Sequence, residues 1–326
     1  MESLKFALNA TLPIVLVVAI GYFVKKVGIM NGGIAKAVNE IVFKVLLPAM
    51  LFLNIYEIED LGEISLNYVW YVVGITIALF LVFLPIVGKL FPVRNQRGVI
   101  LQSIFRSNYA LIGIPLATAL YGDEGAAIAS LLAAFIVPIF NILGVICLCI
   151  YSDDNKPDIK KILLNIVKNP LILGVSAGLV ALAVRALFVK VDVDFRLSDI
   201  TPIIKVLKYL SNAATPMALL ALGAQFEFSA IPALKKQIAF GIALRSVLIP
   251  SLALTVAYFM DIFNGANFAA FVAMFATPVA VSTVPMAQSM GADHELAGQL
   301  VVWTTLISSV VIFLASFILK GVGAFG

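Results

Sequence analysis

The sequence predicts an all-α polytopic membrane protein of ten transmembrane helices, arranged as two inverted five-helix repeats. Composition is the first observation: 62% of the 326 residues are hydrophobic, 12% are charged, and the mean hydropathy is +1.08. Soluble domains carry about 25% charged residues, so this chain cannot cover its surface with polar groups in water. The other observations are apolar runs long enough to cross a ~30 Å hydrocarbon core, and prolines that recur in two halves.

Ten apolar segments, separated by polar or charged residues, are long enough to span a bilayer. They cover residues 7–24, 34–55, 67–91, 98–121, 125–151, 162–185, 202–225, 233–260, 266–290 and 296–319. The polar stretch 152–161 is predicted to be a short cytoplasmic loop. It divides the chain into a first five-helix repeat, 1–151, and a second, 162–326.

Charge indicates the orientation of these spans. Ten spans place both chain ends on one side of the membrane. Lysine and arginine are concentrated in and beside the loops on the other side, whereas the loop around Glu57 and Glu63 carries only acidic charges. Because basic loops stay in the cytoplasm, we expect a cell-membrane protein with both termini outside.

Four pairs of prolines support an internal repeat. They are Pro13 and Pro170, Pro48 and Pro216, Pro85 and Pro250, and Pro115 and Pro285. Their order is the same in both halves and their offsets are similar. Since a unit of five spans is odd, its second copy enters the membrane upside down, as in many secondary transporters.

Two segments concentrate polar residues and helix breakers at mid-span. One reads Arg106-Ser107-Asn108-Tyr109 and continues to Gly113-Ile114-Pro115, and the other runs from Thr277-Pro278 through Ser282-Thr283 to Pro285. Proline removes a backbone donor, and the freed groups find partners only inside protein or along a wet cavity. The alternative is a pair of kinked packing helices whose hydroxyls are satisfied.

Where these two segments cross, half-helix N-termini present positive dipole ends that suit an anion. The amide of Asn108 and the hydroxyls of Thr277, Ser282 and Thr283 are suitable donors. The predicted substrate-binding residues are Arg106, Asn108, Tyr109, Gly113, Ile114, Pro115, Thr277, Pro278, Ser282, Thr283 and Pro285.

The same residues resemble a known family. The stretch from Asn108 to Gly122, with Gly113-Ile114-Pro115-Leu116 inside it, is similar to the fourth helix of the auxin efflux carrier family. Pro278-Val279-Ala280-Val281-Ser282-Thr283, followed by Ala287-Gln288, resembles the ninth helix of bacterial members. Leu222-Gly223-Ala224 resembles a further element, so the likeness extends over the whole chain.

The resemblance implies a fold like that of bile-acid symporters and sodium/proton antiporters. Segments 7–24, 34–55, 162–185 and 202–225 would form a scaffold that often dimerises. The other six would form a moving transport domain, with substrate at the crossing of 98–121 and 266–290. Plant members export auxin, and bacterial relatives are linked to malonate and malate.

Charged side chains inside the predicted spans are the remaining candidates. Arg106 and Arg245 are functional candidates because a buried arginine is costly; the alternative is snorkelling, or pairing with a carbonyl or an acid. Glu40 and Lys44 are predicted to form an intrahelical ion pair. The central parts of the six transport segments contain no Asp or Glu, so the usual device for proton coupling is missing. Sodium coupling through backbone and amide oxygens, and uniport, both stay open.

These observations predict a secondary transporter of small organic anions, mono- or dicarboxylates, working by alternating access. The alternative is a non-transporting receptor or sensor that uses the same pocket. An enzyme is not expected, because nucleophile–base pairs and metal-ligand clusters are lacking in the spans. No cofactor, metal or nucleic acid is predicted; Cys147 and Cys149 are expected to be packing residues and His294 a solvated loop residue. The expected partners are lipid, the anion, a coupling ion (sodium or proton) or none, and a second copy in a homodimer.

Overall fold

All regular structure in the described residues is helical. The computed structural model describes residues 2–57, 66–152, 164, 167–190, 196–259, 263 and 265–321. Its α-helices are α1 (Glu2–Lys26), α2 (Gly32–Ile41), α3 (Leu47–Tyr56), α4 (Leu66–Leu90), α5 (Arg94–Phe105), α6 (Ile114–Ile150), α8 (Pro170–Lys190), α9 (Thr201–Gln225), α10 (Ile231–Ile242), α11 (Ile249–Phe259), α12 (Gly265–Ala276), α13 (Thr283–Ser289) and α14 (His294–Gly321). The all-helical prediction is therefore confirmed.

Short π- and 3₁₀-helices adjust the helical path at several junctions. The π-helices are η1 (Val42–Leu46), between α2 and α3; η2 (Tyr109–Gly113), before α6; and η5 (Ala243–Leu248), between α10 and α11. The 3₁₀-helices η3 (Leu197–Asp199) and η4 (Phe228–Ala230) precede α9 and α10. Single π-turns inside helices are frequent at functional sites, and two of these three lie beside the region described below.

Six helical stretches of the described residues are long and apolar enough to cross a membrane. They are Gly32–Tyr56, Tyr68–Leu90, Tyr109–Ile150, Pro170–Val189, Phe228–Phe259 and His294–Leu319. This agrees with a multi-pass membrane protein, whereas the number of ten spans stays a prediction. The predicted loop 152–161 falls almost entirely on 153–161, which lie outside the described residues.

A sharp turn divides α6 into two arms. Tyr121 has φ −141° and ψ 24°, and Gly122 has φ +64° and ψ −152°. Because positive φ is strained for residues with a Cβ atom, a glycine is required at this turn. The turn coincides with the predicted boundary between segments 98–121 and 125–151.

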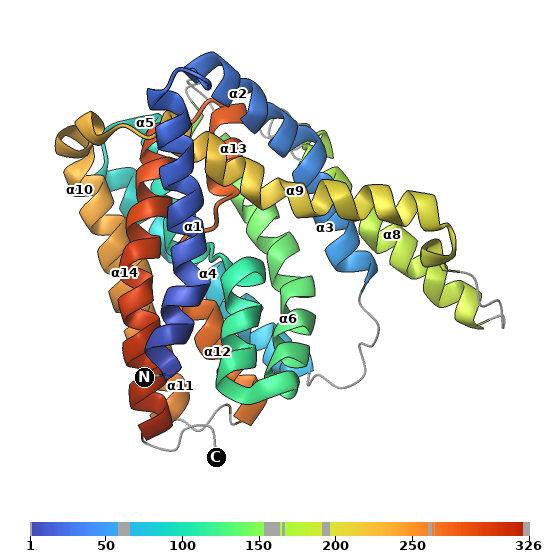
Figure 1. Ribbon diagram of the computed structural model, residues 1–326. Coiled ribbons are helices and arrows are strands. Elements are labelled where there is room, and N and C mark those ends of the chain that lie inside the picture. The colour runs from blue at the N-terminus through green and yellow to red at the C-terminus, as the bar shows by residue number, and fades with distance from the viewer. Residues whose placement is uncertain are drawn as a thin grey trace.

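Two helix pairs approach closely through glycine. α1 packs against α9, and α3 packs against α8 (Figure 1). A Cβ atom at Gly21 would lie 2.2 Å from the carbonyl oxygen of Leu220, and one at Gly178 would lie 3.0 Å from that of Phe52. Small residues let helix backbones approach in this way inside membranes.

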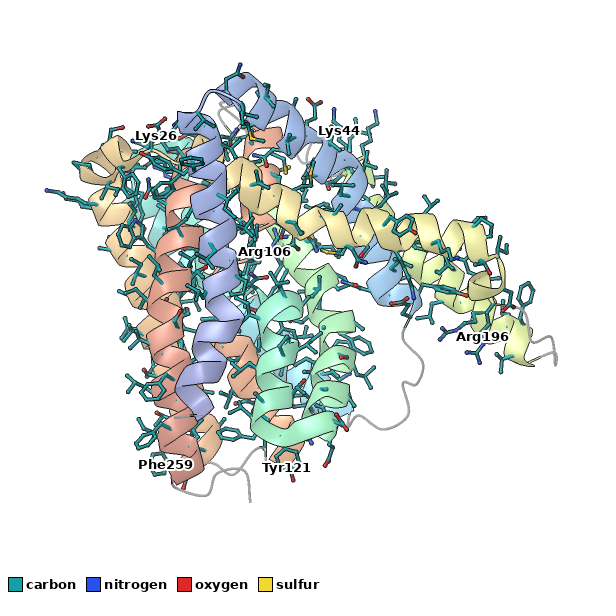
Figure 2. The ribbon with its side chains drawn as sticks, in the orientation of Figure 1. Lys26, Lys44, Arg106, Tyr121, Arg196 and Phe259 are labelled. Carbon is teal, nitrogen blue, oxygen red and sulfur yellow. The ribbon has the colours of Figure 1, made fainter. Side chains whose placement is uncertain are left out.

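The start of α1 and the end of α14 lie at the same end of the molecule (Figure 1). Figure 2 shows Tyr121 and Phe259 at this end, and Lys26 and Lys44 at the opposite end. There Lys44 forms the predicted ion pair with Glu40, which is confirmed.

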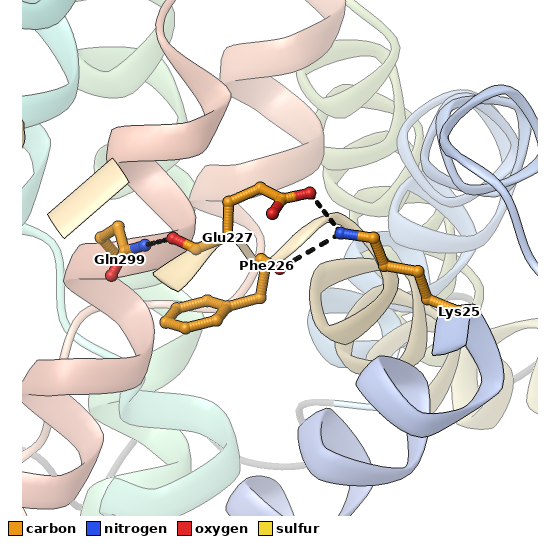
Figure 3. A network of polar contacts seen from close by, with 4 residues as sticks. All are labelled: Lys25, Phe226, Glu227 and Gln299. Atoms are coloured by element: carbon orange, nitrogen blue, oxygen red, sulfur yellow. Dashed lines mark hydrogen bonds and ion pairs between the residues drawn. The ribbon is translucent and has the colours of Figure 1, made fainter. Parts of the chain in front are cut away.

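A polar network joins three parts of the chain at the end that carries Lys26 (Figure 3). Lys25 Nζ pairs with the Glu227 carboxylate and donates to the Phe226 carbonyl at 3.4 Å. Gln299 Nε2 donates to the Glu227 carbonyl at 2.8 Å. The network therefore links α1, the segment after α9, and α14.

α12 is the helix with nearly every residue buried. Ala266 and the nine residues 268–276 of this helix are all buried, and it packs against α6 on one side and α11 on another. Cys147 and Cys149 are both buried, as predicted for packing residues. His294 begins α14 and is half-buried, so it is less solvated than predicted because the loop before it is short.

Candidate functional site

The first polar segment interrupts a helix. α5 ends at Phe105, Arg106 is extended (φ −96°, ψ 108°), and helical structure resumes at Tyr109. In the π-helix that follows, Gly113 leaves room for the Tyr109 ring, because a Cβ atom there would lie 2.4 Å from its Cδ2. The interruption leaves the backbone of 106–108 outside any helix.

The second polar segment interrupts another helix in the same manner. α12 ends at Ala276, and α13 begins at Thr283. Pro278 has no N–H and cannot continue α12. The next amide, that of Val279, donates to Thr304 Oγ1 of α14 at 3.1 Å, so this buried donor is satisfied by a side chain.

The two interrupted segments meet. The amide nitrogen of Asn108 donates to the carbonyl oxygen of Pro278 at 2.8 Å, and Ser107 forms an isolated antiparallel bridge with Val279. Residues 170 and 172 positions apart in the chain therefore share one short stretch of paired backbone. We call this stretch, residues 106–108 and 277–279, the crossing.

A cavity of about 780 Å³ adjoins the crossing. One wall is formed by α1, α3, α8 and α9, and the other by the interrupted segments and α6. Most of the lining is apolar. Its arginine, asparagine, serine and threonine side chains are Asn54, Ser211, Asn212 and Thr215 on the first wall, and Arg106, Ser107, Asn108, Asn141 and Ser282 on the second.

Arg106 is the only Lys or Arg side chain among the residues described as lining this cavity, and it is 2% exposed. Figure 2 places it near the middle of the molecule, between the two ends. Its Nη2 donates to Asn141 Oδ1 at 2.7 Å and to Ser282 Oγ at 2.8 Å. Its Nη1 donates to Gln102 Oε1 at 2.9 Å and contacts Met286 Sδ at 3.1 Å. These partners are all neutral.

Two further polar groups of the cavity lining lack partners. Asn108 Nδ2 and Ser107 Oγ are buried and make no hydrogen bond. Buried polar atoms in native proteins are nearly always paired, and exceptions call for a functional explanation. Both atoms belong to residues that, like Arg106, line one wall of the cavity.

The structure brings five of the eleven predicted site residues to the cavity. They are Arg106, Asn108, Tyr109, Pro115 and Ser282. The described lining does not include the other six, Gly113, Ile114, Thr277, Pro278, Thr283 and Pro285. Thr277 is buried and its hydroxyl donates to the Met274 carbonyl at 3.4 Å, whereas the Pro278 carbonyl belongs to the crossing. The remaining four belong to the helices that follow the two interruptions.

Sequence reasoning missed several polar residues of the cavity. Asn141 accepts from Arg106, and Gly144 lets α6 approach its guanidinium: a Cβ atom there would lie 3.1 Å from Nη1. On the other wall, Asn54, Asn212 and Thr215 were also missed. An amide side chain within an otherwise apolar span is the signal that points to Asn54 and Asn141.

Arg245 lies behind the crossing and is 1% exposed. It donates to the carbonyl oxygens of Thr277, Met274 and Ile104. The predicted alternative, in which a buried arginine pairs with carbonyls, is therefore confirmed for Arg245. Among the described residues, no group of three or more His, Cys, Asp or Glu side chains is arranged to hold a metal ion.

Comparison with known proteins identifies the family. Residues 6–316 match the family described as Membrane transport protein. The chain belongs to this family. It is the auxin efflux carrier family that the residues around Asn108 and Pro278 resemble, so that prediction is confirmed.

Two relatives in the family are similar over nearly their whole length. An uncharacterized transporter of Methanocaldococcus jannaschii is 27% identical over 323 residues, which are 96% of this chain and 98% of the relative. An uncharacterized transporter of Methanothermobacter thermautotrophicus is 22% identical over 332 residues, which are 95% of this chain and 98% of the relative. The family and both relatives support a membrane transport protein.

Proposed function

We propose that this protein is a secondary carrier of small organic anions, mono- or dicarboxylates, which works by alternating access at the crossing. The observation that carries the proposal is Arg106. Its charge is 2% exposed, it borders the cavity, and its described partners are all neutral. A bound carboxylate supplies the missing counter-charge.

The energetic argument is that a buried ion is stable only when its lost hydration is replaced. Removing one partner of a buried ion pair costs about 3–5 kcal/mol. Neutral amide and hydroxyl oxygens compensate Arg106 in part, which keeps the empty site folded. A carboxylate beside Asn108 Nδ2 and Ser107 Oγ adds charge-assisted hydrogen bonds, which are roughly twice as strong as neutral ones.

The proposed architecture has ten spans in two inverted repeats. The turn at Gly122 divides the 42-residue stretch Tyr109–Ile150, and α1 and α9, of 25 residues each, are long enough to span. Further support comes from the glycine contacts. Gly21 faces Leu220 and Gly223, and Gly178 faces Phe52 and Ile55, which are the positions that the proline offsets make equivalent.

In this proposal α1, α3, α8 and α9 belong to a homodimeric scaffold in the cell membrane, and the interrupted segments belong to the moving part. Both termini lie outside. Lys26 and Lys44, at the end of the molecule opposite the start of α1, would then lie on the cytoplasmic side, as expected for basic residues.

Two measurements on the purified protein test the proposal. A panel of acetate, malonate, malate and indole-3-acetate is screened for a rise in melting temperature, Tm, and then for uptake into proteoliposomes. At least one carboxylate is expected to raise Tm and to be taken up. Asn108→Ala is expected to abolish the shift, while Asn95→Ala, outside the described cavity lining, should keep it.

The outcomes separate the competing functions. If no carboxylate is taken up under an imposed membrane potential or ion gradient, the carrier proposal is overturned. A Tm shift without uptake would instead support the receptor alternative. An unchanged shift in Asn108→Ala would remove Asn108 from the site.

A further inference from the structure

Arg245 connects the two helices that stop at the crossing. From η5 its guanidinium donates through Nη2 to the Met274 carbonyl at 2.8 Å, through Nε to the Thr277 carbonyl at 2.9 Å, and through Nη1 to the Ile104 carbonyl at 3.4 Å. Met274 is in the last turn of α12, Thr277 directly follows this helix, and Ile104 is in the last turn of α5. One side chain therefore contacts both helix ends.

The sequence explains why two of these carbonyls are available. In a continuous helix the Met274 carbonyl would accept from the amide of residue 278, but that residue is proline and has no N–H. The Ile104 carbonyl would accept from the amide of Asn108, but this amide donates to the Pro278 carbonyl instead. Both acceptors are thus released by the same interruption that forms the crossing.

The charges at this place balance. The C-terminal end of a helix carries the equivalent of about −0.5 elementary charge, so two such ends together present about −1. The guanidinium supplies +1. Among the described residues, no carboxylate contacts Arg245, and all three of its recorded acceptors are backbone carbonyls.

Clusters of released carbonyls at half-helix C-termini are also what transporters use to coordinate sodium. We propose that Arg245 is a fixed internal cation at such a cluster, that it holds the two interrupted segments together, and that it makes a bound sodium ion unnecessary there. Arg245 is a positioning residue in this proposal, since it does not line the cavity. The part that concerns sodium rests on the proposed carrier function, whereas the positioning role does not.

The test compares three variants of the full-length protein in detergent. Arg245→Ala empties the carbonyl cluster, and Arg245→Lys keeps the charge without the planar fork. Arg94→Ala is the matched control, because Arg94 also donates to backbone carbonyls near a helix end, those of Ile150 and Ser152, but away from the crossing. Tm is measured in sodium chloride and in choline chloride of equal ionic strength, with and without methylguanidinium or methylammonium.

For Arg245→Ala we expect a Tm roughly 5 °C or more below that of the unaltered protein. Millimolar methylguanidinium should restore a substantial part of this loss, because it can occupy the vacated cluster, and methylammonium should restore less. The Tm of Arg245→Lys should lie between that of Arg245→Ala and that of the unaltered protein. Neither methylguanidinium nor methylammonium should raise the Tm of Arg94→Ala more than it raises the Tm of the unaltered protein.

Two results would overturn the proposal. One is a folded Arg245→Ala protein that methylguanidinium does not stabilise. The other is an unaltered protein whose Tm falls, or whose carboxylate uptake stops, when choline replaces sodium. This result would overturn the part of the proposal that concerns sodium, and it can be obtained even if Arg245→Ala does not fold. The restoration of Tm by methylguanidinium is measured without substrate. It therefore tests the positioning role of Arg245 even if the carrier proposal fails.

Discussion

Two arginines lie at the crossing, and their surroundings differ. Arg245 is 1% exposed and donates to three backbone carbonyls at the ends of two helices. Arg106 is 2% exposed, borders the cavity, and donates to the side chains of Asn141, Ser282 and Gln102. The comparison shows how one structural feature, a pair of interrupted helices, supports two different uses of a buried positive charge.

The difference lies in what each charge can still bind. Helix ends supply Arg245 with about one unit of opposite charge, so nothing more is needed there. Amides and hydroxyls supply Arg106 with hydrogen bonds but with no net charge. A ligand anion therefore gains far more beside Arg106 than beside Arg245, and only Arg106 borders a space of about 780 Å³ that could admit one.

The largest expected effect comes from removing the charge that faces the cavity. Arg106→Gln should weaken carboxylate binding about 30- to 150-fold, the equivalent of roughly 2–3 kcal/mol for a hydrogen-bonded charge. Calorimetry with the carboxylate that gives the largest Tm shift measures it. Arg97→Gln, whose arginine donates to the loop carbonyls of Phe91 and Pro92, is the control and should bind normally. Equal binding by Arg106→Gln and the unaltered protein would end the distinction between the two arginines.

A smaller effect is expected from disturbing Arg106 without removing it. In Gly144→Ala the new methyl group would lie 3.0 Å from Gln102 Oε1 and 3.1 Å from Arg106 Nη1, so the guanidinium must shift. We expect about a tenfold loss of affinity, which corresponds to about 1.4 kcal/mol. Gly74→Ala is the matched control, because a Cβ atom there meets nothing within 4 Å. A loss of affinity that is the same in both variants would contradict a local role for Gly144.

The smallest expected effect tests the origin of the Arg245 contacts. Pro278→Ala restores an N–H that can bond the Met274 carbonyl, so this carbonyl should depend less on Arg245. In a double-mutant cycle with Arg245→Lys, we expect the two changes in the free energy of unfolding to be non-additive by about 1 kcal/mol. Unfolding in mixed detergent micelles gives these energies. Pro85→Ala in α4 provides the control cycle, for which simple additivity is expected.

Local patterns in the sequence predicted the helical membrane class, the family, and the places where two helices are interrupted. Hydropathy depends only on the length and composition of a span. Proline and glycine change the backbone conformation of the turn in which they lie. For this reason the interruption after Ala276 and the turn at Gly122 lie where the sequence indicates them. The ion pair of Glu40 and Lys44 was equally predictable, because residues i and i+4 are neighbours on any helix.

The tertiary structure decided which polar residues share a space. Five of the eleven predicted residues line the cavity, and six lie behind its wall or at the crossing, a division that depends on how each interrupted helix is rotated. Asn54, Asn141 and Asn212 come from three helices distant in sequence, and no local pattern brings them together.

The sequence by itself therefore determined that two polar, interrupted helices exist, that Arg106 lies in one of them, and that Arg245 lies inside another span. Only the tertiary structure assigned the two arginines opposite roles. What a buried charge can bind depends on the groups that already contact it. The partners of Arg245 lie 29 to 141 residues away along the chain, and those of Arg106 lie up to 180 residues away. Packing, rather than local sequence, places one guanidinium against carbonyls and the other beside the cavity.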